Sequence, residues 1–189
     1  MNQRTGKGFT LIELMVTVAV AAILLTVGVP SFRDTVENNR LTAAANELVS
    51  ALNLARSEAI KRGVRVTVCK SADGAGCTSS GDWEQGWIVF TDLDGDGAFT
   101  DDGDSTLCES GEDCILRTHE ALPSGYTLRP GVNFDNWVAY LPSGRSQGDS
   151  GLANDTYRLC HGPDINAARS IAVSTTGRVS VSKGATSCP

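Results

Sequence analysis

The segment Lys7-Gly8-Phe9-Thr10-Leu11-Ile12-Glu13-Leu14 opens an apolar run that continues to Val29 and ends at Pro30. From Phe9 to Val29 the run has 21 residues, and a helix of that length spans about 30 Å, the thickness of a bilayer core. Arg4 and Lys7 precede the run without any acidic residue. Positive charges of this kind keep the N-terminus cytoplasmic and send the rest of the chain outward. The sequence therefore predicts a single-pass membrane anchor.

A small residue lies before the apolar run and not after it. A secretory signal has a small-residue cleavage site behind its apolar stretch, but no such site follows this run, whereas Gly8 precedes it. A cut between Gly8 and Phe9 would leave the apolar helix on the mature chain. We therefore expect a leader of residues 1–8, an anchor of residues 9–30 and a globular region of residues 31–189.

Glu13 is an isolated acid within the anchor, four residues after Phe9. A lone carboxylate at membrane depth costs about 2.5–3.5 kcal/mol on insertion scales, so it needs a partner. Nothing cationic lies near it in the mature chain, but a cut after Gly8 would create the α-amino group of Phe9. We expect the amine of one subunit to meet Glu13 of its neighbour in an assembly. The alternative is an ordinary signal anchor with an acid tolerated near the headgroups.

The residues Lys7-Gly8-Phe9-Thr10-Leu11-Ile12-Glu13-Leu14 and the run to Pro30 resemble the class III signal of type IV pilins and type II secretion pseudopilins. This resemblance implies that a prepilin peptidase in the inner membrane cuts after Gly8 and N-methylates Phe9. It also implies that the retained helix packs with other pilins in the core of a filament.

Behind the anchor, apolar residues recur at three- and four-residue steps, which indicates that the helix continues to Arg62. Gly63 provides a C-cap after Lys61 and Arg62, and a kink is expected at Gly28 or Pro30. The apolar stripe comprises Leu41, Ala44, Ala45, Leu48, Leu52, Ala55 and Ala59.

After Gly63 the apolar period changes to two, which predicts short strands separated by Gly, Pro, Ser and Asp. One long helix followed by many strands predicts an α+β fold with an antiparallel sheet packed on the helix stripe. The strand candidates are residues 64–68, 86–91, 115–118, 125–129, 137–141, 157–160, 170–173 and 178–181.

The stretch Asp82-Trp83-Glu84-Gln85-Gly86-Trp87 resembles a strand motif of the GspH/FimT branch of pseudopilins and minor pilins. Residues 139–144 and Gly177-Arg178-Val179 fit the same branch. The resemblance implies a type IV pilin-like fold and a minor subunit that helps to initiate or cap a type IV pilus or a type II secretion pseudopilus. Its globular domain is then periplasmic. For Trp83 and Trp87 themselves we expect core packing.

The charge balance bears on nucleic-acid binding. The chain has 16 Lys and Arg against 22 Asp and Glu, and removal of residues 1–8, with two basic residues and no acid, changes the net charge from −6 to −8. DNA-binding minor pilins of the resembled branch use a Gly-Arg-x-Arg loop, whereas here Gly177-Arg178-Val179-Ser180 lacks the second arginine. DNA uptake is therefore the alternative function, with Arg178 and Lys183 as contacts if Arg145, Arg158 and Arg169 cluster with them.

The cysteines point to disulfides. An even number of cysteines in an exported chain favours disulfides over zinc, and no Cys-x-x-Cys occurs. Six cysteines permit about 15 pairings, so spacing alone leaves the connectivity open. We predict that neighbours pair, each bridge contributing about 2–4 kcal/mol: Cys69 with Cys77, Cys108 with Cys114, and Cys160 with Cys188.

Acidic residues alternate in Asp92-Leu93-Asp94-Gly95-Asp96-Gly97, as at the start of a calcium loop, and three more acids follow at positions 101, 102 and 104. The twelfth position is Gly103 instead of a bidentate glutamate. The segment is thus either a Ca²⁺ site or a solvated acidic loop.

No catalytic centre is expected. Gly148-Asp149-Ser150-Gly151 imitates a serine-protease motif, but His119 and His161 lie in unrelated contexts. The sequence predicts a filament building block without enzymatic activity.

Overall fold

The computed structural model describes residues 8–101, 108 and 111–188. The chain divides into two units, residues 1–40 and residues 41–189, and each is described by itself. The boundary falls ten residues beyond the end of the predicted anchor. Residues 31–40 thus belong with the N-terminal unit in the structure.

One helix, α1 (Leu11–Arg62), passes through both units. It begins two residues after the predicted start and continues through Gly28 and Pro30 without interruption, although Pro30 has no N–H for the preceding turn. It ends as predicted at Gly63, whose φ of +69° favours glycine and whose N–H donates to the Ala59 carbonyl at 3.0 Å.

In the second unit α1 packs through the predicted stripe. All seven residues of the stripe are buried, together with Ala51. Small alanines on this face let the strands approach the helix closely, while Leu48 and Leu52 fill the space between them.

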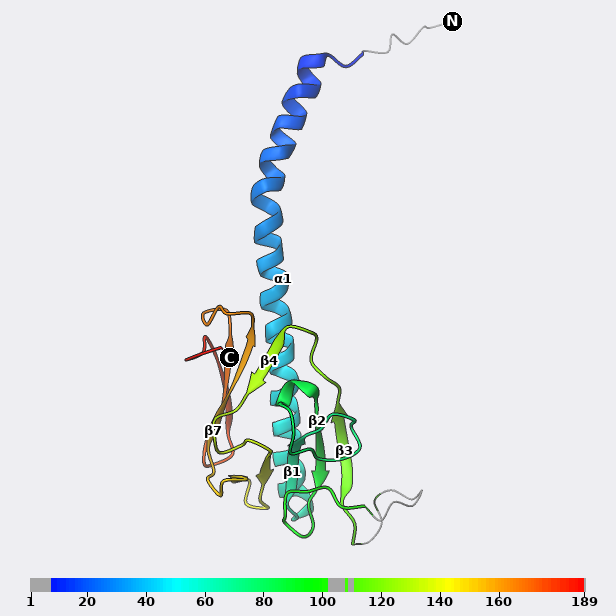
Figure 1. Cartoon of the computed structure of the whole chain (residues 1–189), viewed down its shortest axis with the longest axis vertical. Helices are drawn as coiled ribbons and strands as arrows, with labels where there is room; N and C mark the ends of the chain where they lie inside the picture. Colours follow the sequence, from blue (N-terminus) through cyan, green and yellow to red (C-terminus); the bar gives the residue numbers. More distant parts are fainter. Residues whose placement is uncertain (1–7, 102–107, 109–110, 189) are drawn as a thin grey trace, which may run out of the picture. The chain divides into compact units, whose positions relative to one another are not determined.

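The strands form two antiparallel sheets where the sequence predicted one. The larger sheet has the order β3-β2-β1-β5-β6, and the smaller has the order β4-β7-β8-β9. In Figure 1 β4 and β7 stand apart from β1, β2 and β3. The larger sheet contains β1 (Val66–Lys70), β2 (Trp87–Thr91), β3 (Cys114–His119), β5 (Trp137–Tyr140) and β6 (Ser146–Gly148). The smaller contains β4 (Tyr126–Arg129), β7 (Asp155–His161), β8 (Arg169–Val173) and β9 (Val179–Lys183).

All eight predicted strands exist, with ends that differ from the prediction by at most two residues. The strand β6 was missed, because Ser146-Gln147-Gly148 has no apolar alternation. Ser146 is nevertheless buried, and its hydroxyl donates to the Ala153 and Ser174 carbonyls.

Aromatic side chains from both sheets complete the core above the helix stripe. Trp83 and Tyr157 meet edge to face with ring centroids 5.1 Å apart, and Phe134 lies 6.0 Å from Tyr157. Burial raises the pKa of Tyr140 and of Tyr157 well above the usual tyrosine value, so both hydroxyls stay neutral.

Candidate functional site

The predicted cut between Gly8 and Phe9 lies in an exposed segment without regular structure, directly before α1. A Cβ built on Gly8 would meet no other atom within 4 Å. The folded chain therefore sets no steric requirement for glycine here. Such a requirement would come from a molecule that handles this junction, as the predicted peptidase would.

Glu13 takes part in a reciprocal cap at the start of α1. The Glu13 N–H donates to the Thr10 hydroxyl at 3.3 Å, and the Thr10 N–H donates to Glu13 Oε2 at 3.5 Å. This is the capping box, in which residue N3 returns the bond of the N-cap residue. Its signature, the Thr-x-x-Glu spacing, is present in the sequence, but the cap was not among the predictions. The carboxylate of Glu13 thus lies among the free amides of its own helix terminus.

The first unit presents apolar side chains to its surroundings. Within the described residues, α1 is long and apolar enough to cross a membrane, and its most apolar window is unburied. Its threonine hydroxyls bond inside the helix: Thr17 donates to the Leu14 carbonyl at 2.9 Å and Thr26 to the Ile23 carbonyl at 2.8 Å. The polar groups are therefore satisfied without water, as an apolar environment requires.

The motif Asp82–Trp87 joins the two sheets, and we call it the sheet joint. It comprises Asp82, the short helix η1 (Trp83–Gln85), Gly86 and Trp87, the first residue of β2. The indole N–H of buried Trp83 donates to the carbonyls of Phe134 and Asp135 at 3.1 and 3.0 Å. The prediction that Trp83 packs in the core is confirmed, although it lies in η1 and not in a strand.

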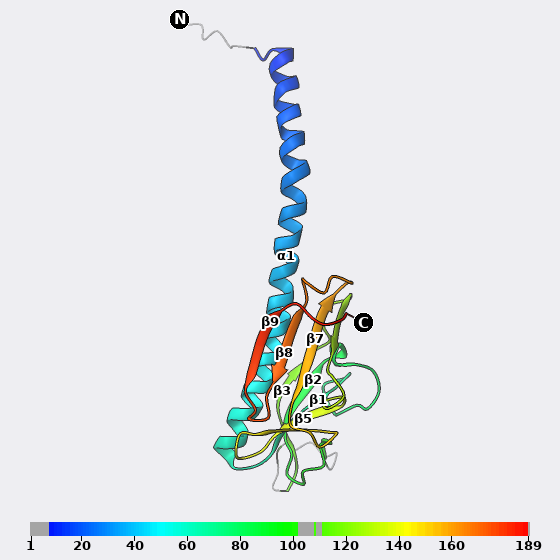
Figure 2. The same ribbon diagram turned by 90° about the vertical axis from the view of Figure 1, so that its left-hand side faces the viewer.

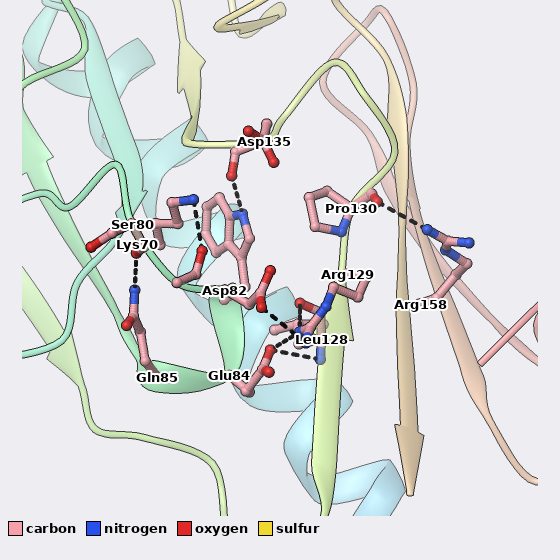
Figure 3. Close-up of polar contacts among 12 residues, drawn as sticks. Lys70, Ser80, Asp82, Glu84, Gln85, Leu128, Arg129, Pro130, Asp135 and Arg158 are labelled. Atoms are coloured by element: carbon pink, nitrogen blue, oxygen red, sulfur yellow. Dashed lines mark hydrogen bonds and ion pairs between the residues drawn. The ribbon is translucent and has the colours of Figure 1, made fainter. Parts of the chain in front are cut away.

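Glu84 and Arg129 connect the sheet joint to β4 (Figure 3). Glu84 Oε2 accepts the Leu128 N–H at 3.2 Å and also contacts Arg129, whose Nη2 lies 3.0 Å from Asp82 Oδ2. The Glu84 carboxylate therefore occupies the position that a further strand would take beside β4. This contact explains why the smaller sheet ends at β4. No local pattern in the sequence predicts the contact.

Gly86 and Trp87 fix the other end of the sheet joint on the larger sheet. Gly86 has a φ of +117°, and a Cβ there would lie 2.5 Å from the His119 carbonyl oxygen. Trp87 is buried and stacks on the His119 ring with centroids 3.9 Å apart. The glycine of the motif thus permits a close backbone approach, and Trp87 packs in the core as predicted.

The profile of the family described as Type II transport protein GspH matches residues 44–182. The chain belongs to the GspH family. The profile of the prokaryotic N-terminal methylation motif matches residues 4–29 and covers the junction and the anchor.

Fimbrial proteins and one solved minor pilin structure are also similar to this chain. A fimbrial protein of Pseudomonas aeruginosa is 34% identical over 108 residues, which cover 55% of this chain and 66% of that protein. The type IV major fimbrial protein FimA of Dichelobacter nodosus is 28% identical over 87 residues, 46% of each chain. Each match thus covers under two thirds of the relative. The crystal structure of the type IV minor pilin FimU of Pseudomonas aeruginosa superposes with a TM-score of 0.57 at 20% identity, over 81% of this chain and 98% of FimU. The predicted pilin-like fold is confirmed.

The disulfides of this GspH-family chain join sequence neighbours, as predicted. Each closes a loop next to a strand, and the longest loop ties the C-terminal segment to β7. The pairs are Cys69–Cys77, Cys108–Cys114 and Cys160–Cys188, with sequence separations of 8, 6 and 28 residues.

The predicted calcium residues converge. One carboxylate oxygen from each of Asp92, Asp94 and Asp96 lies within 4.8 Å of the others. Asp92 is buried and already neutralised, because Oδ2 lies 3.1 Å from Arg65 Nε and accepts the Thr67 hydroxyl at 2.6 Å. A guanidinium thus holds the most buried of the three carboxylates. Calcium binding stays a prediction. Of the other acids in this segment, those at positions 102 and 104 lie outside the described residues.

The carboxylate of Asp113 accepts backbone N–H groups from the acidic segment that contains Asp92, Asp94 and Asp96. Burial, and then the charges of Asp92 and Asp94, raise the pKa of Asp113, although the Leu93 and Thr100 N–H groups bond to its carboxylate and act against the shift. A carboxyl whose pKa is raised by folding stabilises the folded state at low pH. That contribution is lost as the pH rises through the folded-state pKa.

The protease-like motif has other partners. Asp149 accepts the N–H groups of Asp135 and Asn136 at 3.2 and 2.8 Å, and the Ser150 hydroxyl donates to the Asn133 side chain at 3.1 Å. These bonds hold the loop in place, so the motif has a structural role.

The predicted DNA contacts gather only in part: exposed Arg145 and Arg178 follow Gly144 and Gly177, which lie in close contact, whereas Lys183 lies at the far end of β9. Arg178 and Lys183 are exposed, but they flank opposite ends of β9. Of the arginines expected to join them, Arg169 is buried and donates to the Thr42 hydroxyl and two carbonyls, and Arg158 donates to Ser187 and the Pro130 carbonyl. The geometry therefore gives DNA binding little support in this GspH-family chain.

Proposed function

We propose that the chain is a minor pilin or pseudopilin, a structural subunit of a type IV pilus or a type II secretion pseudopilus. The observation that carries this proposal is the exposed Gly8–Phe9 junction, followed at once by the Thr10–Glu13 capping box and an unburied apolar helix. The methylation-motif profile over residues 4–29 and the GspH-family fold support it.

The first step is anchorage and processing. The apolar part of α1 holds the chain in the inner membrane, with Arg4 and Lys7 on the cytoplasmic side and the second unit in the periplasm. Prepilin peptidase cuts the amide bond after Gly8, and the new amine of Phe9 is methylated. The open space around Gly8 leaves the bond accessible to the enzyme.

The second step is entry into a filament. The charged amine of Phe9 lies at the positive end of the α1 macrodipole and is disfavoured there. The Glu13 carboxylate, already held at that end by the capping box, supplies the opposite charge for the amine of a neighbouring subunit. Packing of apolar helices provides most of the assembly energy, and this charge pair sets the axial register.

In this proposal the chain is a structural subunit without catalytic activity. The two filament systems share the peptidase, the signal and the fold, and the matched names point to both: a type II transport family and fimbrial relatives. An experiment distinguishes the two systems: the assembly machinery of each is deleted in turn, and the chain belongs to the system whose deletion keeps it in the membrane.

The test combines processing and incorporation in cells that make the filament. Mass spectrometry of the wild-type chain should show an N-terminus at methylated Phe9, whereas Gly8→Leu should keep the leader. Glu13→Gln should be processed and anchored but enter filaments about tenfold less, the loss expected for one charge pair of about 1.4 kcal/mol. Glu13→Asp is the matched control that keeps the charge. A chain that still starts at Met1 inside working filaments would refute the proposal.

A further inference from the structure

The strand β9 (Val179–Lys183) has one unpaired edge. It is the last strand of the smaller sheet and pairs with β8 (Figure 2). The Ser174 N–H donates to the Arg178 carbonyl before the strand, and the Gly184 N–H donates to the Ala168 carbonyl after it. Antiparallel pairing alternates between bonded and unbonded residues, so Ser180 and Ser182 bond to β8. The N–H and C=O groups of Val179, Val181 and Lys183 therefore point away from the sheet.

Two other edge strands in the described part of the chain, β4 and β6, have bonded outward groups. On β4 the outward N–H of Leu128 donates to Glu84, and that of Tyr126 donates to the Pro123 carbonyl. On β6 the N–H of Gly148 donates to the Leu152 carbonyl. Proteins usually protect such edges because an unpaired edge is a template for another strand. For the outward groups of β9, no partner is found among the described residues.

The side chains of β9 also suit a partner strand. Val181 lies opposite buried Ile171 and so faces the core side of the sheet, yet it is 44% exposed. An added strand would cover it. The serines at positions 180 and 182 are small and exposed, and the strand has no proline or bulge. A flat, five-residue edge of this kind pairs readily with an extended segment.

Charge does not favour a second copy of β9 as the partner. In a symmetric antiparallel pair centred on Val181, Arg178 of each copy would lie opposite Gly184 of the other and Lys183 opposite Val179, so neither cation would meet an acidic side chain. Both residues are exposed cations on a chain with a net charge of −6. The complementary occupant is an extended segment with acidic side chains near its ends.

We propose that β9 is a docking edge that binds an acidic-flanked, extended segment of a different filament subunit by strand addition. The inference rests on the proposed function, because it takes the partner from the same filament. It assigns a contact for the second unit beyond the packing of anchor helices.

The decisive variant is Val181→Pro in the full chain, in cells that make the filament. Proline removes an N–H that points outward, so it deletes one bond to a partner strand while the bonds to β8 remain. Loss of one such bond should lower the amount of chain that purifies with filaments by about tenfold. Val181→Ala keeps the N–H and should lower it by no more than about threefold. Lys183→Glu should act like Val181→Pro, and Lys183→Arg like the wild type.

Formation of the Cys160–Cys188 disulfide, read from gel mobility without reductant, shows whether each variant folds. If Val181→Pro fails this check, a photo-crosslinking residue at position 182 replaces it and should give an adduct with another subunit. Wild-type levels of folded Val181→Pro, an equal loss with Val181→Ala, or an adduct only between identical chains would overturn the inference. Wild-type retention that a nuclease abolishes would also overturn it, in favour of DNA. If even the wild type is absent from filaments, the proposed function fails, which separates the two failures.

Discussion

The two units use the same helix in opposite ways. Residues 11–40 of α1 leave large apolar side chains such as Leu24 exposed, whereas residues 41–62 bury a stripe of alanines and leucines such as Leu48. The sequence already separates them, because residues 9–29 form an almost continuous apolar run whereas residues 41–62 have apolar residues at three- and four-residue steps. The difference lies in what the chain provides as a partner.

For the second segment the chain provides two sheets and an aromatic core, and the stripe is complete within one molecule. For the first segment the described residues provide no burial, and the proposed function supplies it from lipid or from the helices of other subunits. The comparison predicts that changes in the second segment unfold the molecule, whereas changes in the first leave it folded and alter where it resides.

The largest expected effect comes from shortening one leucine in each segment. Leu48→Ala should lower the free energy of unfolding by about 2–5 kcal/mol, because it leaves a cavity under the sheets. Leu24→Ala should change it by less than about 0.5 kcal/mol. The measurement is denaturant unfolding of the full chain in detergent, followed by tryptophan fluorescence. All three tryptophans, Trp83, Trp87 and Trp137, lie in the second unit.

Equal losses for the two leucines would contradict the comparison, because they would show that the anchor contributes to the stability of the second unit. The matched readout is membrane retention. There Leu24→Ala removes apolar surface from the anchor, and Leu48→Ala does not.

Local patterns predicted the helix, its stripe, its glycine cap and eight strands, because these follow from periodicity within short windows. Contacts between distant residues were not predictable in this way. The Glu84–Leu128 bond, which ends the smaller sheet, joins residues 44 apart, and nothing near either residue marks it. At the junction, the roles of Gly8, Phe9 and Glu13 stay predictions, whereas the Thr10–Glu13 cap was not predicted although its Thr-x-x-Glu spacing is visible in the sequence.

A smaller effect on the free energy of unfolding is expected at the sheet joint. It tests whether contacts within the second unit connect its two sheets. Glu84→Ala leaves the Leu128 N–H and Arg129 without their carboxylate and should cost about 1–3 kcal/mol of unfolding free energy. Glu84→Gln keeps one acceptor and should cost less. Fluorescence unfolding of the two variants provides the measurement, and Asn53→Ala is a control on the exposed surface of α1. A loss no greater than that of the control would show that the joint does not connect the sheets energetically.

The smallest effect is expected for calcium at Asp92, Asp94 and Asp96, because the second unit provides its own cation there. Because Arg65 already neutralises Asp92, millimolar calcium should raise the melting temperature of the full chain by less than about 2 °C. Arg65→Gln frees the buried carboxylate and should make the calcium response larger, whereas Arg65→Lys keeps the charge and should behave like the wild type. The measurement is the melting temperature with calcium and with a chelator. A large, saturable shift in the wild type would show that a metal ion, and not the guanidinium, is the intended counter-charge of Asp92, Asp94 and Asp96. In that case the second unit, like the anchor, would depend on something outside the chain.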